Sequence, residues 1–492
     1  MSRNRIILVT IGIMLSLFLA SMESTVVATA MPTIVGQLGG LEHYAWVFSA
    51  YMLASTTSVP LYGKLSDLYG RRKLYVLAMA LFLTGSILCG QAGTMTQLIL
   101  ARGLQGLGAG GIMPLAFILI GEMFTLEQRA RMQGFFSGVW GVSSIVGPLL
   151  GGFLVDKLSW HWVFYVNIPP GLIAAALVAF AWQDQDQSHA RPAVDYAGAA
   201  LLSASVIALL LGLVDTGTST SWVLIASSIV LFVLLLWVES RAVDPILPIP
   251  LFRDRLFATA IAHGVLAGWA MFGSVSFIPL FVQSVLGTNA TQAGITLAPM
   301  LLGWVTASII GTRILLKVGY RRLAITGTSL LTVGAFLMSR VDADISRTML
   351  MTFVSLMGIG MGFSIPSLLI AVQTTVTRRQ LGAATSTLQF SRSIGGTLGV
   401  SVMGAALSAR LASNLSASGL DPELVSQLLD PLPGAQAVIS EGARVAVADA
   451  ITVVFLLAFI AAGLALTATL FTPRTALKEK SAGNESVRVS TD

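Results

Sequence analysis

The stretch that decides the fold is Gly63-Lys-Leu-Ser-Asp67-Leu-Tyr-Gly70-Arg71-Arg72-Lys73, a short basic segment between two long apolar runs. A second break of the same kind follows in the C-terminal half: Gly311-Thr-Arg313-Ile-Leu-Leu-Lys317-Val-Gly319-Tyr-Arg321-Arg322. Each break joins two runs that are long and apolar. The pair indicates that one membrane unit has been used twice.

The composition places the chain in a lipid bilayer. Of its 492 residues, 55% are hydrophobic and 11% are charged, whereas a soluble domain carries about 25% charged residues. A helix that crosses the bilayer needs about 20 apolar residues, and the chain contains about fourteen such runs. They predict helices, because an open strand would leave backbone groups unpaired in hydrocarbon. We therefore expect an all-α integral membrane protein.

The net charge of +6 does not indicate nucleic-acid binding, because the basic residues lie in alternate loops. Arg71 and Arg321 belong to the richly basic loops of one side, while the other side receives few cations, such as Lys157 and Arg340. By the positive-inside rule this asymmetry predicts that both termini are cytoplasmic. Cys89 is the single cysteine, so an intrachain disulfide is excluded.

Polar segments divide the chain into six, two and six predicted helices. Residues 1–182 form the first six-helix bundle, 183–255 a linker with two inserted helices, 256–472 the second bundle, and 473–492 a disordered tail. An internal repeat supports two parallel halves, since Gly106, Gly108, Gly110 and Pro114 recur with the same spacing as Gly358, Gly360, Gly362 and Pro366. Halves of this kind place a substrate site at their interface, near mid-membrane.

Glu23 and Arg102 are the charged residues that need explaining. A carboxylate deep in the first apolar run should face a cavity or be protonated, because the bilayer interior penalises its charge. It could load a proton on one side and release it on the other, or form a structural hydrogen bond. Arg102 does not lose its charge in a protein, so it needs a carboxylate or carbonyl partner unless it snorkels to the interface. We expect it to hold a polar network that senses Glu23.

The first basic break is the predicted gate. Asp67 can cap a helix start or pair with basic residues, and with Gly63, Gly70, Arg71 and Arg72 it would latch the cytoplasmic side. This role is gating and involves no chemical reaction.

Aromatic and polar residues within the apolar runs are candidate walls of a substrate cavity, because such surfaces suit lipophilic ligands. The alternative is that they only pack the bundle. The candidates are Trp46, Tyr51, Gln105, Trp140, Phe281, Gln283 and Arg392.

The glycine-rich runs predict close helix packing. Gly106-Leu-Gly108-Ala-Gly110-Gly111 fits a dinucleotide-binding pattern by spacing alone, but no strand precedes it and an apolar helix follows. The fifth run carries the same kind of packing positions: Gly138, Gly147, Pro148, Gly151 and Gly152. We find no Walker A sequence, no metal-ligand cluster and no nucleophile–base pair, and we expect neither an enzyme nor a bound cofactor.

Five segments together resemble the major facilitator superfamily, in particular its fourteen-helix drug:proton antiporters. They are Gly63–Lys73 (loop motif), Arg102–Gly106 (fourth-helix motif), Gly138–Gly152 (antiporter motif), Glu23–Pro32 (first-helix motif) and Trp160–Pro169 (sixth-helix motif). The resemblance implies the major facilitator fold, with two six-helix bundles and two additional central helices.

The resemblance also implies an exporter that works by alternating access. Glu23 would be the membrane-embedded acid, Asp67 and Arg71 the gate, and Arg102 the proton-linked arginine. The family usually has Asp at the position of Glu23, and the tenth run lacks the acids typical of exporters of dications. The expected protein is therefore a monomeric, proton-driven multidrug exporter of small amphipathic or lipophilic compounds in the inner (plasma) membrane. The alternatives are an exporter or flippase of lipids or lipid-linked molecules, and a membrane sensor without transport.

Overall fold

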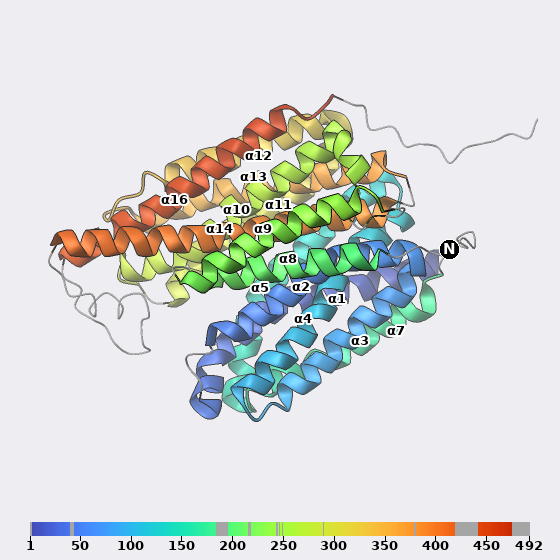
Figure 1. Cartoon of the computed structure of the whole chain (residues 1–492), viewed down its shortest axis with the longest axis horizontal. Helices are drawn as coiled ribbons and strands as arrows, with labels where there is room; N and C mark the ends of the chain where they lie inside the picture. Colours follow the sequence, from blue (N-terminus) through green and yellow to red (C-terminus); the bar gives the residue numbers. More distant parts are fainter. Residues whose placement is uncertain are drawn as a thin grey trace, which may run out of the picture.

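The computed structural model describes residues 2–39, 44–183, 195–214, 218–242, 245, 247, 249–288, 290–377, 380–418 and 441–474. Throughout these ranges the regular structure is helical, with no strand (Figure 1). Most of the predicted tail, most of the polar part of the linker and residues 419–440 lie outside the described residues.

The helices form two groups with a pair between them (Figure 1). The first group is α1 (Arg3–Leu38), α2 (Tyr44–Tyr69), α3 (Arg71–Gly90), α4 (Met95–Met123), α5 (Leu126–Lys157), α6 (Trp162–Tyr165) and α7 (Ile168–Ala181). The pair is α8 (Tyr196–Val214) and α9 (Ser219–Glu239), followed by a short 3-10 helix, η2 (Ile249–Arg253). The second group is α10 (Arg255–Ser284), α11 (Ala290–Val318), α12 (Tyr320–Met338), α13 (Arg347–Thr375), α14 (Leu381–Ser418) and α16 (Glu441–Leu470).

Local signals account for several helix starts. The side chains of Thr94 and Ser346 accept hydrogen bonds from backbone N–H groups in the first turns of α4 and α13, and Asp254 does the same for α10. These are N-caps, which satisfy otherwise unpaired donors. Gly70 and Gly319 precede α3 and α12 with φ of +95° and +87°, a conformation that glycine adopts without steric penalty. Each basic break therefore contains a turn of one residue, Gly70 or Gly319, and the rest of the break belongs to the two flanking helices.

Within the described residues, ten helical segments are long and apolar enough to cross a membrane. The remaining helices of crossing length, α2, α5, α8 and α12, pack beside these ten. The chain is thus a multi-pass helical membrane protein. Its expected count of fourteen crossings stays a prediction.

Each group of helices has its own apolar core. One core draws almost all of its residues from α1–α7 and includes Cys89, which is fully buried. The other draws on α10–α14 and α16.

The glycine repeat performs the same packing in both groups. A Cβ added at Gly106 would overlap the backbone of α2, and one at Gly108 the backbone of α3. The equivalent Gly358 and Gly360 meet the backbones of α11 and α12 in the same way. Small residues permit this close approach between membrane helices, so α4 and α13 are each held tightly between two neighbours.

Two seams join the groups: α2 lies against α14, and α5 lies against α11. The inserted α8 covers the first seam. Its Leu202 and Val206 belong to a small apolar cluster that also contains Leu53 of α2 and Phe390 of α14. Among the described residues, this cluster includes none from α5 or α11, so the inserted pair packs on one seam and not on the other.

Candidate functional site

A buried ion pair lies inside the first group of helices. Nη1 of Arg102 on α4 donates to Oε1 of Glu23 on α1 at 2.6 Å, and each side chain is only 1% exposed. Glu23 therefore points into the protein and not into lipid. The predicted partnership between these residues is present in the structure, and the proton-linked role assigned to them stays a prediction.

Neutral groups complete the hydrogen bonding of the pair. Asn167, at the start of α7, donates from Nδ2 to Oε2 of Glu23 at 2.6 Å. Gln105 accepts from Arg102 at 2.7 Å and donates to the hydroxyl of Ser86 on α3 at 2.7 Å. The backbone oxygen of Val47 on α2 accepts from Nε of Arg102 at 3.2 Å, so residues of five helices, α1, α2, α3, α4 and α7, gather around one carboxylate and one guanidinium. Buried charges are tolerated when they are paired and hydrogen-bonded in this way.

Arg102 connects the buried pair to a cavity. Its guanidinium carbon lies 4.2 Å above the ring of Tyr51 on α2, which is a cation–π contact. Both residues line a cavity of about 500 Å³ between α2 and α4 of the first group and α10 and α14 of the second. Leu210 and Leu213 of α8 also line it. Glu23 does not line this cavity and lies behind Arg102.

Three predicted cavity walls lie where they were expected, since Trp46, Tyr51 and Trp140 all line this cavity. Gln105 does not. It is fully buried and serves the ion pair from behind.

Two predicted walls require correction. Phe281 is fully buried in the core of the second group, where its ring packs on Phe455 with centroids 6.1 Å apart. Gln283 lies near the end of α10, where Nε2 contacts the backbone oxygen of Pro279 at 3.4 Å, and it is not among the residues lining this cavity. Both lie near the C-terminal end of α10, beyond Phe272 and Ser276, which do line the cavity.

Arg392 lies beside the central cavity. It lines two smaller spaces next to Trp140 and His263, and Nη2 donates to Oε1 of Gln389 at 2.9 Å. Gln389 itself lines the central cavity. Arg392 thus reaches the cavity through Gln389, which is a less direct position than the predicted contact with substrate.

The predicted gate lies where α2 meets α14. Asp67 forms an ion pair with Arg71, which also contacts Oε1 of Glu122 on α4 at 3.0 Å. The same Asp67 carboxylate accepts hydrogen bonds from the backbone N–H groups of Gly382 and Ala383, at 3.2 and 2.9 Å. A carboxylate at a helix N-terminus is stabilised by the helix dipole. Asp67 therefore ties the first group of helices to the start of α14 in the second.

Two glycines allow this contact. A Cβ at Gly63 would overlap the hydroxyl of Ser386 and lie 2.8 Å from the backbone oxygen of Gly382. Gly70 supplies the turn between α2 and α3, as described above. Arg72 is exposed at the start of α3. The latch lies about two helical turns beyond Val59, the last residue of α2 that lines the cavity, so it closes that seam on the predicted cytoplasmic side.

The predicted packing positions of α5 divide into two kinds. A Cβ at Gly147 would overlap the hydroxyl of Thr25 on α1, and one at Gly151 would lie 3.0 Å from the backbone oxygen of Val26. At Gly138 and Gly152 an added Cβ would meet nothing within 4 Å, so their assignment to helix packing is wrong. Pro148 lies in α5 as expected.

Several members of these sites carried no prediction of their own. Asn167 and Ser86 complete the ion pair, and Glu122 joins the latch. Asn167 lies in the quoted sixth-helix segment, so its polar side chain amid apolar residues was an available signal. Nothing in the sequence marks the backbone donors of Gly382 and Ala383.

The family model for the Major Facilitator Superfamily matches residues 13–400. The chain belongs to the Major Facilitator Superfamily. Two curated relatives come from Bacillus subtilis (strain 168). Multidrug transporter protein MdtP is 41% identical over 86% of this chain and 79% of its own length. Multidrug resistance protein 3 is 36% identical over 96% of each chain.

Solved structures support the same fold at low sequence identity. The human organic anion transporter MFSD10 (TETRAN) superposes with a TM-score of 0.63 at 14% identity, covering 94% of this chain and all of that one. A bacterial homologue of the human lysosomal transporter Spinster, in an inward-facing conformation, gives 0.59 at 16% identity over 96% and 98%. The predicted major facilitator fold is confirmed.

Proposed function

We propose that this superfamily member is a proton-coupled antiporter that exports small amphipathic or lipophilic compounds from the cell across its plasma (inner) membrane. The observation that carries the proposal is the contact of Arg102 with both Glu23 and the central cavity. The names of the two Bacillus relatives, which describe multidrug transport and multidrug resistance, support the same substrate class.

The ion pair offers a direct way to link a proton to a substrate. When Glu23 is charged, it holds Arg102 against α1. A proton on Glu23 removes that attraction and leaves a buried cation without its counter-charge, which is strongly unfavourable. Arg102, which already stacks on Tyr51, then gains by moving away from Glu23 and farther into the cavity. A substrate that occupies this space would compete with the freed guanidinium, so proton and substrate would bind in turn.

The latch supplies the conformational part of the scheme. It spans two groups of helices that must separate on the cytoplasmic side for a substrate to enter from there. Its strength comes from one carboxylate that pairs with Arg71 and caps α14 at once. Breaking the latch opens the inward path, and remaking it exposes the cavity to the other side.

The test uses the purified full-length chain in proteoliposomes with an imposed pH gradient and ethidium as the transported cation. Wild type should move ethidium against its gradient and release protons in exchange. Glu23→Gln keeps the side-chain shape and should reduce both fluxes to background, while Glu23→Asp should retain part of them. Size-exclusion profiles and thermal unfolding check that each variant is folded. Proton-coupled ethidium flux in folded Glu23→Gln would refute the proposal.

A further inference from the structure

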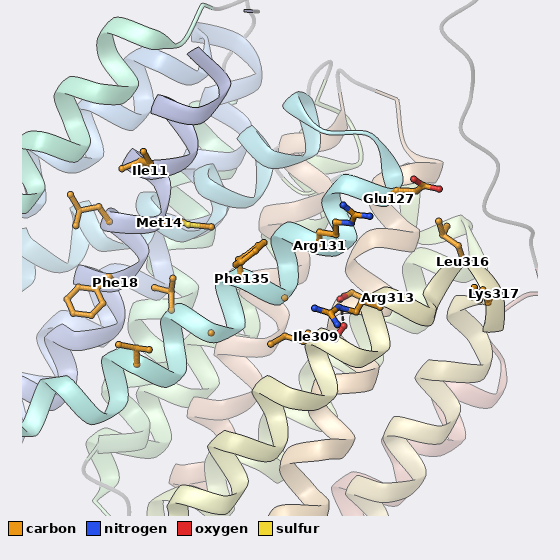
Figure 2. A pocket seen from close by; sticks show the side chains of 16 residues that line it. Ile11, Met14, Phe18, Glu127, Arg131, Phe135, Ile309, Arg313, Leu316 and Lys317 are labelled. Carbon is orange, nitrogen blue, oxygen red and sulfur yellow. Dashed lines mark hydrogen bonds between the residues drawn. The ribbon is translucent and has the colours of Figure 1, made fainter. Parts of the chain in front are cut away.

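A second large cavity lies outside the proposed transport site. It is a groove of about 1400 Å³ with walls from α1, α5 and α11. Figure 2 shows Met14 and Phe18 of α1 on one side, Phe135 of α5 along the floor, and Ile309 of α11 on the other side. The groove shares no lining residue with the central cavity. Its volume exceeds the roughly 300–1,000 Å³ usual for a drug-sized ligand.

The groove opens toward the membrane. Ile11 is 49% exposed, Phe135 59%, Val142 54% and Leu316 43%. In a membrane protein, large apolar side chains with this much exposure face lipid chains. Gly134 of α5 and Ile309 of α11 lie against each other in the wall of the groove, where a Cβ at Gly134 would be 3.2 Å from the Ile309 side chain. An apolar occupant would therefore come from the bilayer.

Cations gather at one end of the groove. Arg131 on α5 and Arg313 and Lys317 on α11 line it, against a single acid, Glu127 (Figure 2). Arg313 and Lys317 are one turn apart and so lie on the same face of α11. All three cations are exposed, and within the described part of the chain none of them forms a salt bridge. The positive-inside rule places this end at the cytoplasmic surface.

The corresponding seam on the opposite side of the molecule is closed. There Asp67 caps α14, and α8 covers α2 and α14. The second basic break, from Gly311 to Gly319, contains no acid, so α11 has no residue that could form the equivalent latch with α5. The two copies of the repeat thus differ. The seam between α2 and α14 is closed, whereas the seam between α5 and α11 carries a groove with an apolar floor and basic residues at one end.

We propose that this groove binds an anionic phospholipid of the cytoplasmic leaflet. An acyl chain would lie on the apolar floor of α5, and the phosphate headgroup would lie among Arg131, Arg313 and Lys317. Basic pockets between membrane helices on the cytoplasmic side are suited to such headgroups. The site goes beyond the proposed function, because it uses none of the residues assigned to proton or substrate.

Native mass spectrometry of the full-length protein tests the proposal, with equal amounts of phosphatidylglycerol and phosphatidylcholine added in detergent. Wild type should retain phosphatidylglycerol preferentially. The triple variant Arg131→Gln/Arg313→Gln/Lys317→Gln should lose this preference. The ratio of retained phosphatidylglycerol to phosphatidylcholine should fall about fivefold for each cation removed. The matched control is Arg253→Gln/Arg255→Gln/Arg322→Gln, which removes the same charge from exposed positions that do not line the groove.

A second pair of variants tests the location without changing charge. Gly138 lines the groove, and a Cβ there would meet nothing within 4 Å, so the side chain of Gly138→Leu should project into the groove and obstruct it. Gly152 is equally open but does not line the groove, which makes Gly152→Leu the control. Retention of phosphatidylglycerol should fall in Gly138→Leu only. If the triple variant does not fold, this pair of variants still tests whether the lipid binds in the groove.

Several outcomes would overturn the proposal. Equal retention of the two lipids by wild type would show that the cations do not select an anionic headgroup. An equal loss in the control triple variant would show that charge acts non-specifically. Undiminished retention in Gly138→Leu would place the lipid elsewhere. Displacement of the lipid by free glycerophosphate would indicate an ion site and not a lipid site. None of these results depends on whether the protein transports ethidium.

Discussion

Arg102 holds Glu23 at 2.6 Å where both side chains are almost completely buried. In such a position the two charges depend on each other. Removing one partner of a buried pair leaves an uncompensated charge, whereas replacing both by neutral groups of similar size is often close to neutral. The pair therefore adds little to the stability of the protein compared with two neutral groups. The protein is nevertheless sensitive to the charge of Glu23, because loss of that charge leaves Arg102 buried without a counter-charge.

The first prediction is a double-mutant cycle on this pair. Arg102→Met should lower the free energy of unfolding by about 3–5 kcal/mol, because the Glu23 carboxylate then lacks its counter-charge. Glu23→Gln should also be destabilising, since it leaves Arg102 unpaired. The double variant should be much more stable than the sum of the two losses implies. Denaturant unfolding in detergent measures all four proteins, and strictly additive losses would mean that the residues are not coupled.

The second prediction separates a cavity wall from a core residue. Trp140 lines the central cavity and Phe281 is fully buried in the second core. Phe281→Ala should cost about 3–5 kcal/mol of stability. Trp140→Ala should change the apparent affinity for ethidium in proteoliposomes with a smaller loss of stability. If Phe281→Ala were as stable as wild type and altered ethidium affinity, its placement in the core would be wrong.

The third prediction concerns the latch. Ser386 is 1% exposed beside Gly63, so a cysteine there should react slowly with a membrane-impermeant maleimide in inside-out vesicles. The background is Cys89→Ala, which removes the single native cysteine. Adding Asp67→Asn breaks the ion pair with Arg71 and should speed labelling of Ser386→Cys. The control is Asp156→Asn, the same change at an exposed position on α5. Equal labelling rates in both variants would contradict a latch at Asp67.

Charge made the central site predictable from the sequence. An acid and a guanidinium inside apolar runs must find partners, and Glu23 and Arg102 pair with each other. A helix start was among the expected partners of Asp67, but which helix it caps could not be predicted, because backbone N–H groups are common to all residues except proline. The structure adds a condition at position 382, where a Cβ would lie 2.5 Å from Oδ1 of Asp67. Asn167 carries no charge and so gave no comparable signal.

Apolar residues were harder to assign, because the rotation and depth of each helix decide what they face. Trp140 and Phe281 look alike in the sequence, yet one lines a cavity and the other packs in a core. The groove could not be predicted for a related reason. Arg131, Arg313 and Lys317 fit the positive-inside pattern without any further role, and only the fold brings α5 and α11 together.

The final prediction compares two glycines of α5, Gly147 and Gly152. The sequence predicts helix packing at both, but only Gly147 lies against a neighbouring helix in the structure. Gly147→Ala should destabilise the protein by about 1–3 kcal/mol, since the new methyl group overlaps the Thr25 hydroxyl and overpacks the α1–α5 contact. Gly152→Ala meets open space and should be neutral or stabilising by up to about 1 kcal/mol, because alanine restricts the unfolded chain.

A second-site change tests the cause of that loss. Thr25→Ala removes the hydroxyl that the Gly147→Ala methyl group would meet, so the double variant should recover part of the lost stability. Thermal unfolding in detergent compares wild type with Gly147→Ala, Gly152→Ala, Thr25→Ala and the double variant Gly147→Ala/Thr25→Ala. If Thr25→Ala gave no recovery of stability, the overlap at Gly147 would not be the reason for the loss.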